Sequence, residues 1–478
     1  MKIYKKKLLA ISNVALLLVI AIGFLFANLK FDDFYSISKF LSIYTIINLI
    51  LLEIILLKYE KRINFYELFI VLCFLFLFGQ CYAITFFKTL GEKSLFNITS
   101  SFFNTRLLYK TSFFVLICIF CMSIGYLIAI NNYNIFNKEK HSNKNPSMID
   151  RKSITKIGWI LLIVSILPTM YLCYKDIVAL KTYGYAITIS APTGIDKILN
   201  IFKGIFQSSL LILIISEQGK RKKTSYMILI VYLLEEMIGG TRIQTFRFLI
   251  ILLLLYFEKH KITLKNIGLG ILITIIASII FSFISASRTT AISMESFGNF
   301  ISLLNKNNVL YDILIECGHT QTLLMVVFLK CPSIVDFQYG FSFIRALLSA
   351  IPNLGFWNIH PAMKTVDTVF SPLYTDKIGL GGSIFAVMYW NFGFFIGPIA
   401  MCFFGAIIAK LTNKINNSSD LIEKFLSYYL LFYFSFLVRG DIEQFGRDLV
   451  YYCIFPIFLM KIYNNFEKNK GINYENSM

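Results

Sequence analysis

Apolar runs long enough to cross a lipid bilayer as helices recur from one end of this chain to the other. Of its 478 residues, 57% are hydrophobic and only 15% are charged, whereas a surface that faces water needs far more charge. Because lipid offers no hydrogen-bond partners, each apolar segment must pair its own backbone groups, as a helix does. The sequence therefore predicts an all-α, polytopic transmembrane bundle that forms a single integral membrane domain over residues 1–478.

Basic residues indicate how this bundle is oriented. With the N-terminus inside, the inner segments carry more than half of the Lys and Arg residues although the outer segments are nearly twice as long. We therefore expect both termini in the cytoplasm and assign the net charge of +19 to loops, not to a nucleic-acid partner. About twelve spans are predicted, at 8–28, 37–57, 65–87, 112–130, 154–173, 198–215, 226–239, 242–257, 266–285, 383–409, 425–438 and 448–460.

One outer segment, 286–382, stands out by its length between the ninth and tenth predicted spans. It carries four of the nine prolines and includes two apolar or amphipathic stretches, 320–330 and 341–351. Long loops without structure are rare, so we expect this segment to fold into short helices that lie on the membrane.

Arginine is distributed differently from lysine. Seven of the ten arginines fall in or beside predicted outer segments, where basic residues are normally scarce. The planar guanidinium stays charged and holds phosphate oxygens in pairs, so this pattern indicates a lipid-linked phosphate or pyrophosphate substrate. The seven are Arg106, Arg242, Arg247, Arg288, Arg345, Arg439 and Arg447.

The turn Gly239-Gly240-Thr241-Arg242 is the sharpest candidate for binding phosphate. Two glycines let the backbone approach a ligand, and the helix that follows begins with free N–H groups and a positive dipole end. Glu235 and Glu236 lie just before the turn in an apolar span, where ionisable groups are costly. A salt bridge from one of them to Arg242 or Arg247 is the alternative, purely structural interpretation.

Two other arginine segments have similar alternatives. Arg288 lies in Ser-Ala-Ser-Arg-Thr-Thr, which suits an oxyanion and equally suits an ordinary helix exit. Segment 439–448 holds five charges between two apolar spans. If it is helical, Arg439, Glu443 and Arg447 share one face; a solvated hairpin with internal ion pairs is the alternative. Arg345, on an amphipathic stretch, is interpreted as a residue that snorkels to the membrane surface.

Candidate general bases lie in the same outer regions. Glu316 and His319 are three residues apart in the long segment, and Asp441 follows Arg439. Motifs that hold nucleotides, dinucleotides or zinc are absent from the sequence, so no cofactor or metal is expected. Further acid–base candidates are Asp336, His360, Asp367 and Asp376.

Taken in order, these motifs resemble those of the Wzy-type O-antigen or capsule polysaccharide polymerases of bacteria. The predicted topology covers nearly the whole chain, and the motif likeness covers about 239–448. The motifs are the turn at 239–242, Glu316-x-Gly318, Tyr339-Gly340 before Ile351-Pro352, Gly381-Gly382-Ser383, Tyr389-x-Asn391-Phe392-Gly393 followed by Gly397, and Arg439-Gly440-Asp441.

The resemblance implies a glycosyltransferase of the multi-span, lipid-phosphate-sugar type. It would polymerise undecaprenyl-pyrophosphate-linked repeat units into O-antigen or capsular polysaccharide at the outer face of the cytoplasmic membrane. A chain-length regulator and a flippase are its candidate partners. The residues expected to hold pyrophosphate are Arg242, Arg288 and Arg439, with Arg447, Gly239, Gly240 and Thr241 in support. Glu316 is the first choice as general base, and His319 and Asp441 are the reserves.

Other functions stay open at this stage. An O-antigen ligase would share the outer arginines. A transporter or flippase of lipid-linked oligosaccharide would more typically show charges in several mid-span helices and repeat symmetry between its halves. A membrane scaffold would use its arginines only in ion pairs.

Overall fold

The computed structural model describes residues 2–60, 63–87, 103–136, 148–183, 194–238, 243–259, 309–352, 360–374 and 379–475. All regular elements in these ranges are helices, which confirms the predicted all-α class. The first half contains α1 (Lys2–Ala27), α2 (Phe34–Glu60), α3 (Phe65–Phe86), α5 (Thr105–Phe136), α6 (Met148–Tyr183), α8 (Gly194–Ser216), α9 (Gly219–Ile238) and α10 (Ile243–Lys259). The second half contains α13 (Val309–Lys330), α14 (Phe341–Leu348), η2 (Pro361–Met363), α15 (Val366–Phe370), η3 (Ser371–Leu373), α16 (Ile384–Asn417), α17 (Leu421–Phe434), α18 (Phe445–Leu449), the π-helical turn η4 (Val450–Ile454) and α19 (Phe455–Glu475).

Nine of the described helices are long and apolar enough to cross a membrane, and α10 contributes a shorter apolar helix. The chain is therefore a multi-pass helical membrane protein, while the number of twelve spans stays a prediction. The predicted ninth span, 266–285, lies outside the described residues. One candidate span, Leu310–Lys330, falls within segment 286–382, for which the sequence predicts only short helices.

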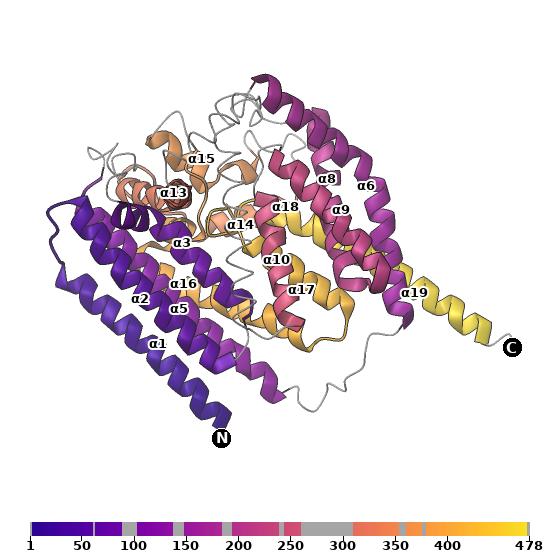
Figure 1. Cartoon of the computed structure of the whole chain (residues 1–478), viewed down its shortest axis with the longest axis horizontal. Helices are drawn as coiled ribbons and strands as arrows, with labels where there is room; N and C mark the ends of the chain where they lie inside the picture. The colour runs from indigo at the N-terminus through magenta and orange to yellow at the C-terminus, as the bar shows by residue number, and fades with distance from the viewer. Residues whose placement is uncertain are drawn as a thin grey trace.

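The helices form two groups (Figure 1). Helices α1, α2, α3 and α5 run side by side at one end of the molecule, and α6, α8 and α9 gather at the other. Between the groups, α17 contacts both α10 and α8. Helix α16 packs along α5, and α13 packs on α3, so the C-terminal half of the chain closes over the N-terminal helices.

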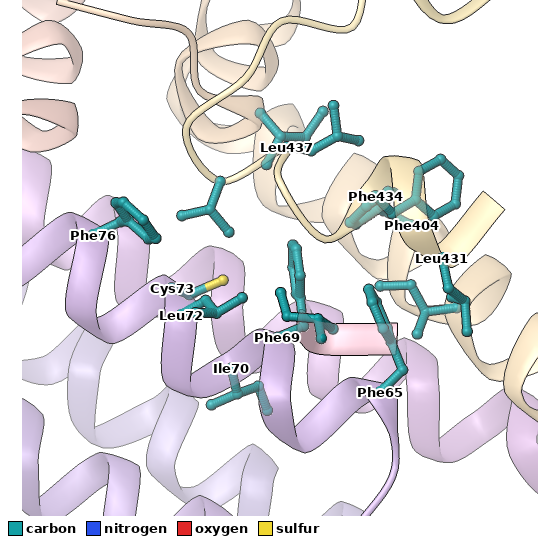
Figure 2. Packing of buried hydrophobic residues seen from close by; sticks show 14 of the residues in the cluster. Phe65, Phe69, Ile70, Leu72, Cys73, Phe76, Phe404, Leu431, Phe434 and Leu437 are labelled. Carbon is teal, nitrogen blue, oxygen red and sulfur yellow. The ribbon is translucent and has the colours of Figure 1, made fainter. Parts of the chain in front are cut away.

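Aromatic side chains from α3, α16 and α17 pack against one another (Figure 2). Phe69 contacts Phe404 with ring centroids 5.9 Å apart, and Phe404 contacts Phe434 at 5.3 Å. Leu437, just beyond the end of α17, is buried beside the same cluster. Because helices in lipid associate mainly through such close packing, these contacts fix where the chain leaves α17.

Glycines bring two pairs of helices into backbone contact. A Cβ atom on Gly79 of α3 would lie 2.5 Å from the carbonyl oxygen of Leu314, and one on Gly318 of α13 would overlap the backbone of Gln80. Gly125 of α5 and Gly405 of α16 approach each other's helices in the same way. Small residues permit this approach between membrane helices. The α3–α13 crossing fixes the position of the Glu316–His319 turn.

Helix α16 is interrupted at Gly393, whose φ of 66° and ψ of −165° are not helical. Just before the break, the buried side chain of Asn391 accepts hydrogen bonds from the backbone N–H groups of Gly340 (3.1 Å) and Ser342 (3.2 Å). These groups belong to the start of α14, which has free N–H donors. Two motifs that are far apart in the sequence, at 339–340 and 389–393, thus dock α14 on α16.

Candidate active site

The chain between α17 and α18 forms a series of turns that begins at Ser435 and ends where α18 starts at Phe445. The conditional prediction of a helical face through Arg439, Glu443 and Arg447 is therefore wrong. Local bonds explain the turns, since Arg439 N donates to the carbonyl of Phe436 at 2.9 Å and Gly440 follows directly. As a result, the charged side chains of this segment reach different parts of the molecule.

Arg439 reaches α13. Its Nη1 donates to the backbone carbonyl of Glu316 at 2.9 Å, and its guanidinium lies over the ring of Phe76, 5.9 Å from the centroid. The side chain is half-buried. Both contacts are with uncharged groups, so they orient the guanidinium without cancelling its charge. The remaining N–H donors of the Arg439 guanidinium suit an oxyanion.

His319 lies one helical turn after Glu316, with Arg439 and Glu316 as charged neighbours of its ring. Gln80 of α3 places its Nε2 atom 3.3 Å from Nδ1 of His319 and 3.1 Å from the hydroxyl of Thr322. With the Gln80 amide oriented so that Nε2 faces the ring, its N–H donates to Nδ1, and the ring then carries its proton on Nε2. This tautomer makes His319 a hydrogen-bond donor. The geometry therefore favours Glu316 over His319 as a base.

Asp441 is turned away from this cluster. Its carboxyl group accepts hydrogen bonds from the hydroxyl of Thr365 and from the backbone N–H groups of Val366 and Asp367, at the start of α15. Its Oδ1 atom is enclosed and lies where a Cβ on Gly382 would stand. Burial, together with the nearby charge of Asp367, raises the pKa of Asp441 to about 7. The surroundings suit a structural contact better than access to a sugar hydroxyl.

Arg447 and Arg345 differ from their predicted settings. Arg447 already pairs with Asp448, with Nε 3.3 Å from Oδ1, and its Nη2 donates to Gln444 at 2.9 Å. Arg345 is only 7% exposed, so its interpretation as a snorkelling residue is wrong. Of the predicted outer arginines, Arg439 is thus the one that contacts the candidate base segment within the described residues.

A family model described as O-antigen polysaccharide polymerase Wzy matches residues 8–470, nearly the whole chain. The chain belongs to this family. It is an enzyme of the glycosyltransferase type that polymerises lipid-linked oligosaccharide repeat units, as the sequence predicts, and the ligase and transporter alternatives are not favoured. In the comparisons with curated proteins and with solved structures, nothing matches the chain.

The buried setting of Asp441 predicts how the stability of the polymerase depends on pH. Its pKa in the folded state, about 7, lies above the ordinary value of 3.8, so the folded protein binds this proton more tightly than the unfolded chain does. The stability that Asp441 contributes is therefore greatest at low pH and is lost as the pH rises from about 4 to about 7. Replacing Asp441 with asparagine should reduce the difference in Tm between about pH 5 and about pH 8.

Thermal unfolding of the detergent-solubilised protein measures this difference. Asp420→Asn is the matched control, because Asp420 is an exposed N-cap of α17 and asparagine caps a helix equally well. An Asp441→Asn protein with the same pH dependence as the parent and the control would contradict the assignment.

Several predicted site residues lie outside the described residues of the polymerase, namely Gly239, Gly240, Thr241, Arg242 and Arg288. Their roles stay predictions. The neighbouring Glu236 forms an ion pair with Lys203 of α8 at 2.5 Å. Arg247 instead lies over three rings of α17 and the turn after it, at 5.2 to 5.9 Å from their centroids, so the predicted pairing of Arg247 with a glutamate is replaced by cation–π contacts.

Sequence reasoning missed Gln80, which orients His319. The available signal is a polar side chain within an apolar span, where such groups mark functional or packing sites. Asp367, predicted as an acid–base candidate, has a structural contact: its Oδ1 accepts from the backbone N–H of Gly381 at 2.9 Å and from Ser371. Within the described ranges, no three His, Cys, Asp or Glu side chains come together as metal ligands.

Proposed function

We propose that the polymerase uses an undecaprenyl-pyrophosphate-linked glycan as donor and transfers it to the sugar of a second lipid-linked repeat unit. The observation that carries this proposal is the contact of Arg439 with the Glu316 carbonyl. This contact places the Arg439 guanidinium, whose described contacts are with uncharged groups, next to the candidate base Glu316. A reaction that expels a pyrophosphate and deprotonates a hydroxyl needs these two groups together.

In the proposed reaction, an acceptor hydroxyl attacks the anomeric carbon of the donor glycan. A new glycosidic C–O bond forms, the C–O bond to pyrophosphate breaks, and the acceptor proton moves to the Glu316 carboxylate. Arg439 stabilises the negative charge that develops on the leaving pyrophosphate. His319 donates its Nε2–H to a substrate oxygen.

We keep Arg242 and Arg288, with the 239–241 backbone, as further pyrophosphate ligands by sequence argument alone. Arg447 ranks behind them because Asp448 already neutralises it. Asp441 ranks behind Glu316 as a base because its carboxyl group is turned toward α15.

We further propose that the site faces the periplasm or the cell exterior and that the protein lies in the cytoplasmic membrane. The basic inner loops support this orientation. A flippase would then deliver the lipid-linked units to the outer face, and a chain-length regulator would act on the growing polymer, which is O-antigen or capsular polysaccharide.

Deletion of the gene tests this proposal. We expect long surface glycans to disappear and a single repeat unit to remain on the final acceptor, while lipid-linked single units accumulate. In spheroplasts, these units should be accessible to an externally added lectin or periodate, because polymerisation is proposed at the outer face. Accumulated units that react only after the membrane is permeabilised would contradict the proposed orientation. Persistence of long chains would contradict the proposed function.

A further inference from the structure

A cavity of about 600 Å³ lies beside α14, and its described lining includes neither Arg439 nor any residue of α13. The loop before α14, the segment around α15 and the start of α16 form its walls. Most of its lining surface is apolar, and the polar and aromatic side chains in it are Gln338, Phe341, Arg345, Lys364, Thr368 and Trp390. Trp390 forms part of one wall, and its orientation is fixed because its indole N–H donates to the carbonyl of Asp336 at 3.1 Å.

Arg345 is the central charge of this cavity. Its guanidinium lies between two aromatic rings, 5.2 Å from the centroid of Trp390 and 5.6 Å from that of Phe341. Nη1 donates to Gln338 at 2.9 Å and Nη2 to Ser342 at 3.1 Å, which are neutral partners. Its enclosed Nε has no hydrogen-bond partner among the described residues. A buried cation in such a setting is costly unless an anion joins it.

The nearest carboxyl group compensates this charge poorly. Glu443 is fully buried, and its Oε1 lies 4.0 Å from Nη2 of Arg345, beyond hydrogen-bonding distance. Burial, together with the nearby charge of Asp441, raises the pKa of Glu443 to about 8, so the charged form that would pair with Arg345 is disfavoured. Lys364 adds a second positive charge at the exposed rim. The cavity is therefore positive, with no Asp or Glu among its described lining residues.

The outer face of α14 is apolar. Ile344 and Leu347 are each more than half exposed, whereas Phe341 and Arg345 on the same helix line the cavity. A short helix with one exposed apolar face and one polar face is typical of a membrane surface. The cavity therefore lies beside a helix face that suits contact with lipid.

We propose that this cavity binds an oxyanion of a lipid-linked glycan through Arg345 and Lys364. The oxyanion is either a phosphate of the lipid or a carboxylate of an acidic sugar. The proposal rests on the proposed function, since a polymerase must hold a donor and an acceptor at once. The turn at 439–443 connects the two positions, because Arg439 contacts α13 and Glu443 faces Arg345.

Quenching of tryptophan fluorescence tests binding without any measurement of activity. The protein in lipid nanodiscs is titrated with undecaprenyl pyrophosphate, which lacks the glycan, and separately with a glycan of glucuronic-acid units, which lacks phosphate. Trp390→Phe identifies the signal that comes from the cavity. Arg345→Gln should weaken binding about 10-fold to 100-fold, the loss of one or two charge-assisted hydrogen bonds. Lys364→Gln should weaken it less.

Two variants make the titration decisive. Lys364 is exposed, so Lys364→Gln tests the site even if Arg345→Gln does not fold. Arg221→Gln removes an exposed arginine at the start of α9 and should bind like the parent. Binding of the pyrophosphate probe alone assigns the site to the lipid phosphate, and binding of the acidic glycan alone assigns it to an acidic sugar.

The proposal is overturned if neither probe changes the Trp390 signal, or if Lys364→Gln and a folded Arg345→Gln both bind like Arg221→Gln. If Arg345→Gln does not fold, Lys364→Gln that binds like Arg221→Gln overturns it alone. Failure of the proposed function would show separately, as long chains that persist in the deletion strain, and it does not alter the titration.

Discussion

Arg439→Lys is expected to lower the rate of polymerisation about 100-fold or more, the effect of removing one oriented donor from a site where negative charge develops. Lysine keeps the charge, but its compact ammonium lacks the planar set of donors with which a guanidinium can bind the Glu316 carbonyl and a pyrophosphate oxygen at once. Arg439→Ala should cost more, since it removes the charge as well. The measurement is the rate at which the purified protein converts lipid-linked single units, extracted from the deletion strain, into long chains.

Arg447→Lys is the matched control for this prediction. It is the same substitution eight residues further on, at an arginine that already pairs with Asp448 and Gln444. Its loss of activity should be less than about tenfold, because an ion pair at a partly exposed site contributes little. Equal losses in the two variants, or near-normal activity of Arg439→Lys, would contradict the assigned role of Arg439.

Glu316→Gln is expected to lower the maximal rate by about 100-fold to 10,000-fold, the range for loss of a general base. Glutamine has nearly the same shape, and the bond from Arg439 goes to the backbone carbonyl, so the substitution leaves that contact in place. Substrate binding should therefore change little, and the loss should fall on kcat with KM almost unchanged. Initial rates over a range of lipid-linked substrate concentrations separate the two.

His319→Gln is the comparison for the choice of base. His319 is placed as a donor by the Gln80 amide, and glutamine retains an N–H donor, so we expect a loss of less than about tenfold. A larger loss in His319→Gln than in Glu316→Gln would contradict the choice of base and transfer that role to His319.

The sequence predicted the helical membrane class and the family correctly, because both depend on features that are local or ordered along the chain. Long apolar runs force helices in lipid. The length of α13 was missed, since Glu316 and His319 break its apolar pattern. The glycine contact with α3 shows that this part of α13 packs against another helix, and that contact joins positions more than 200 residues apart.

Segment 439–448 and Arg345 show a second limit of the sequence. Four-residue spacing suggests a helical face, but the turn after α17 is held by Gly382 and α13, which lie far away in the chain. The amphipathic pattern of 341–351 correctly indicates one apolar face. It does not show that Arg345 is buried against Trp390, which lies in α16 three residues before the break at Gly393.

The most direct test of the proposed active site is a double-mutant cycle on Arg439 and Glu316, measured as the polymerisation rate of purified protein on extracted lipid-linked units. Residues that act in one transition state show strong non-additivity, whereas independent sites add in free energy. We predict that the Arg439→Lys, Glu316→Gln double variant loses much less activity than the product of the two single losses. Single losses that multiply fully, or a double variant that still forms long chains at the parental rate, would contradict a shared active site.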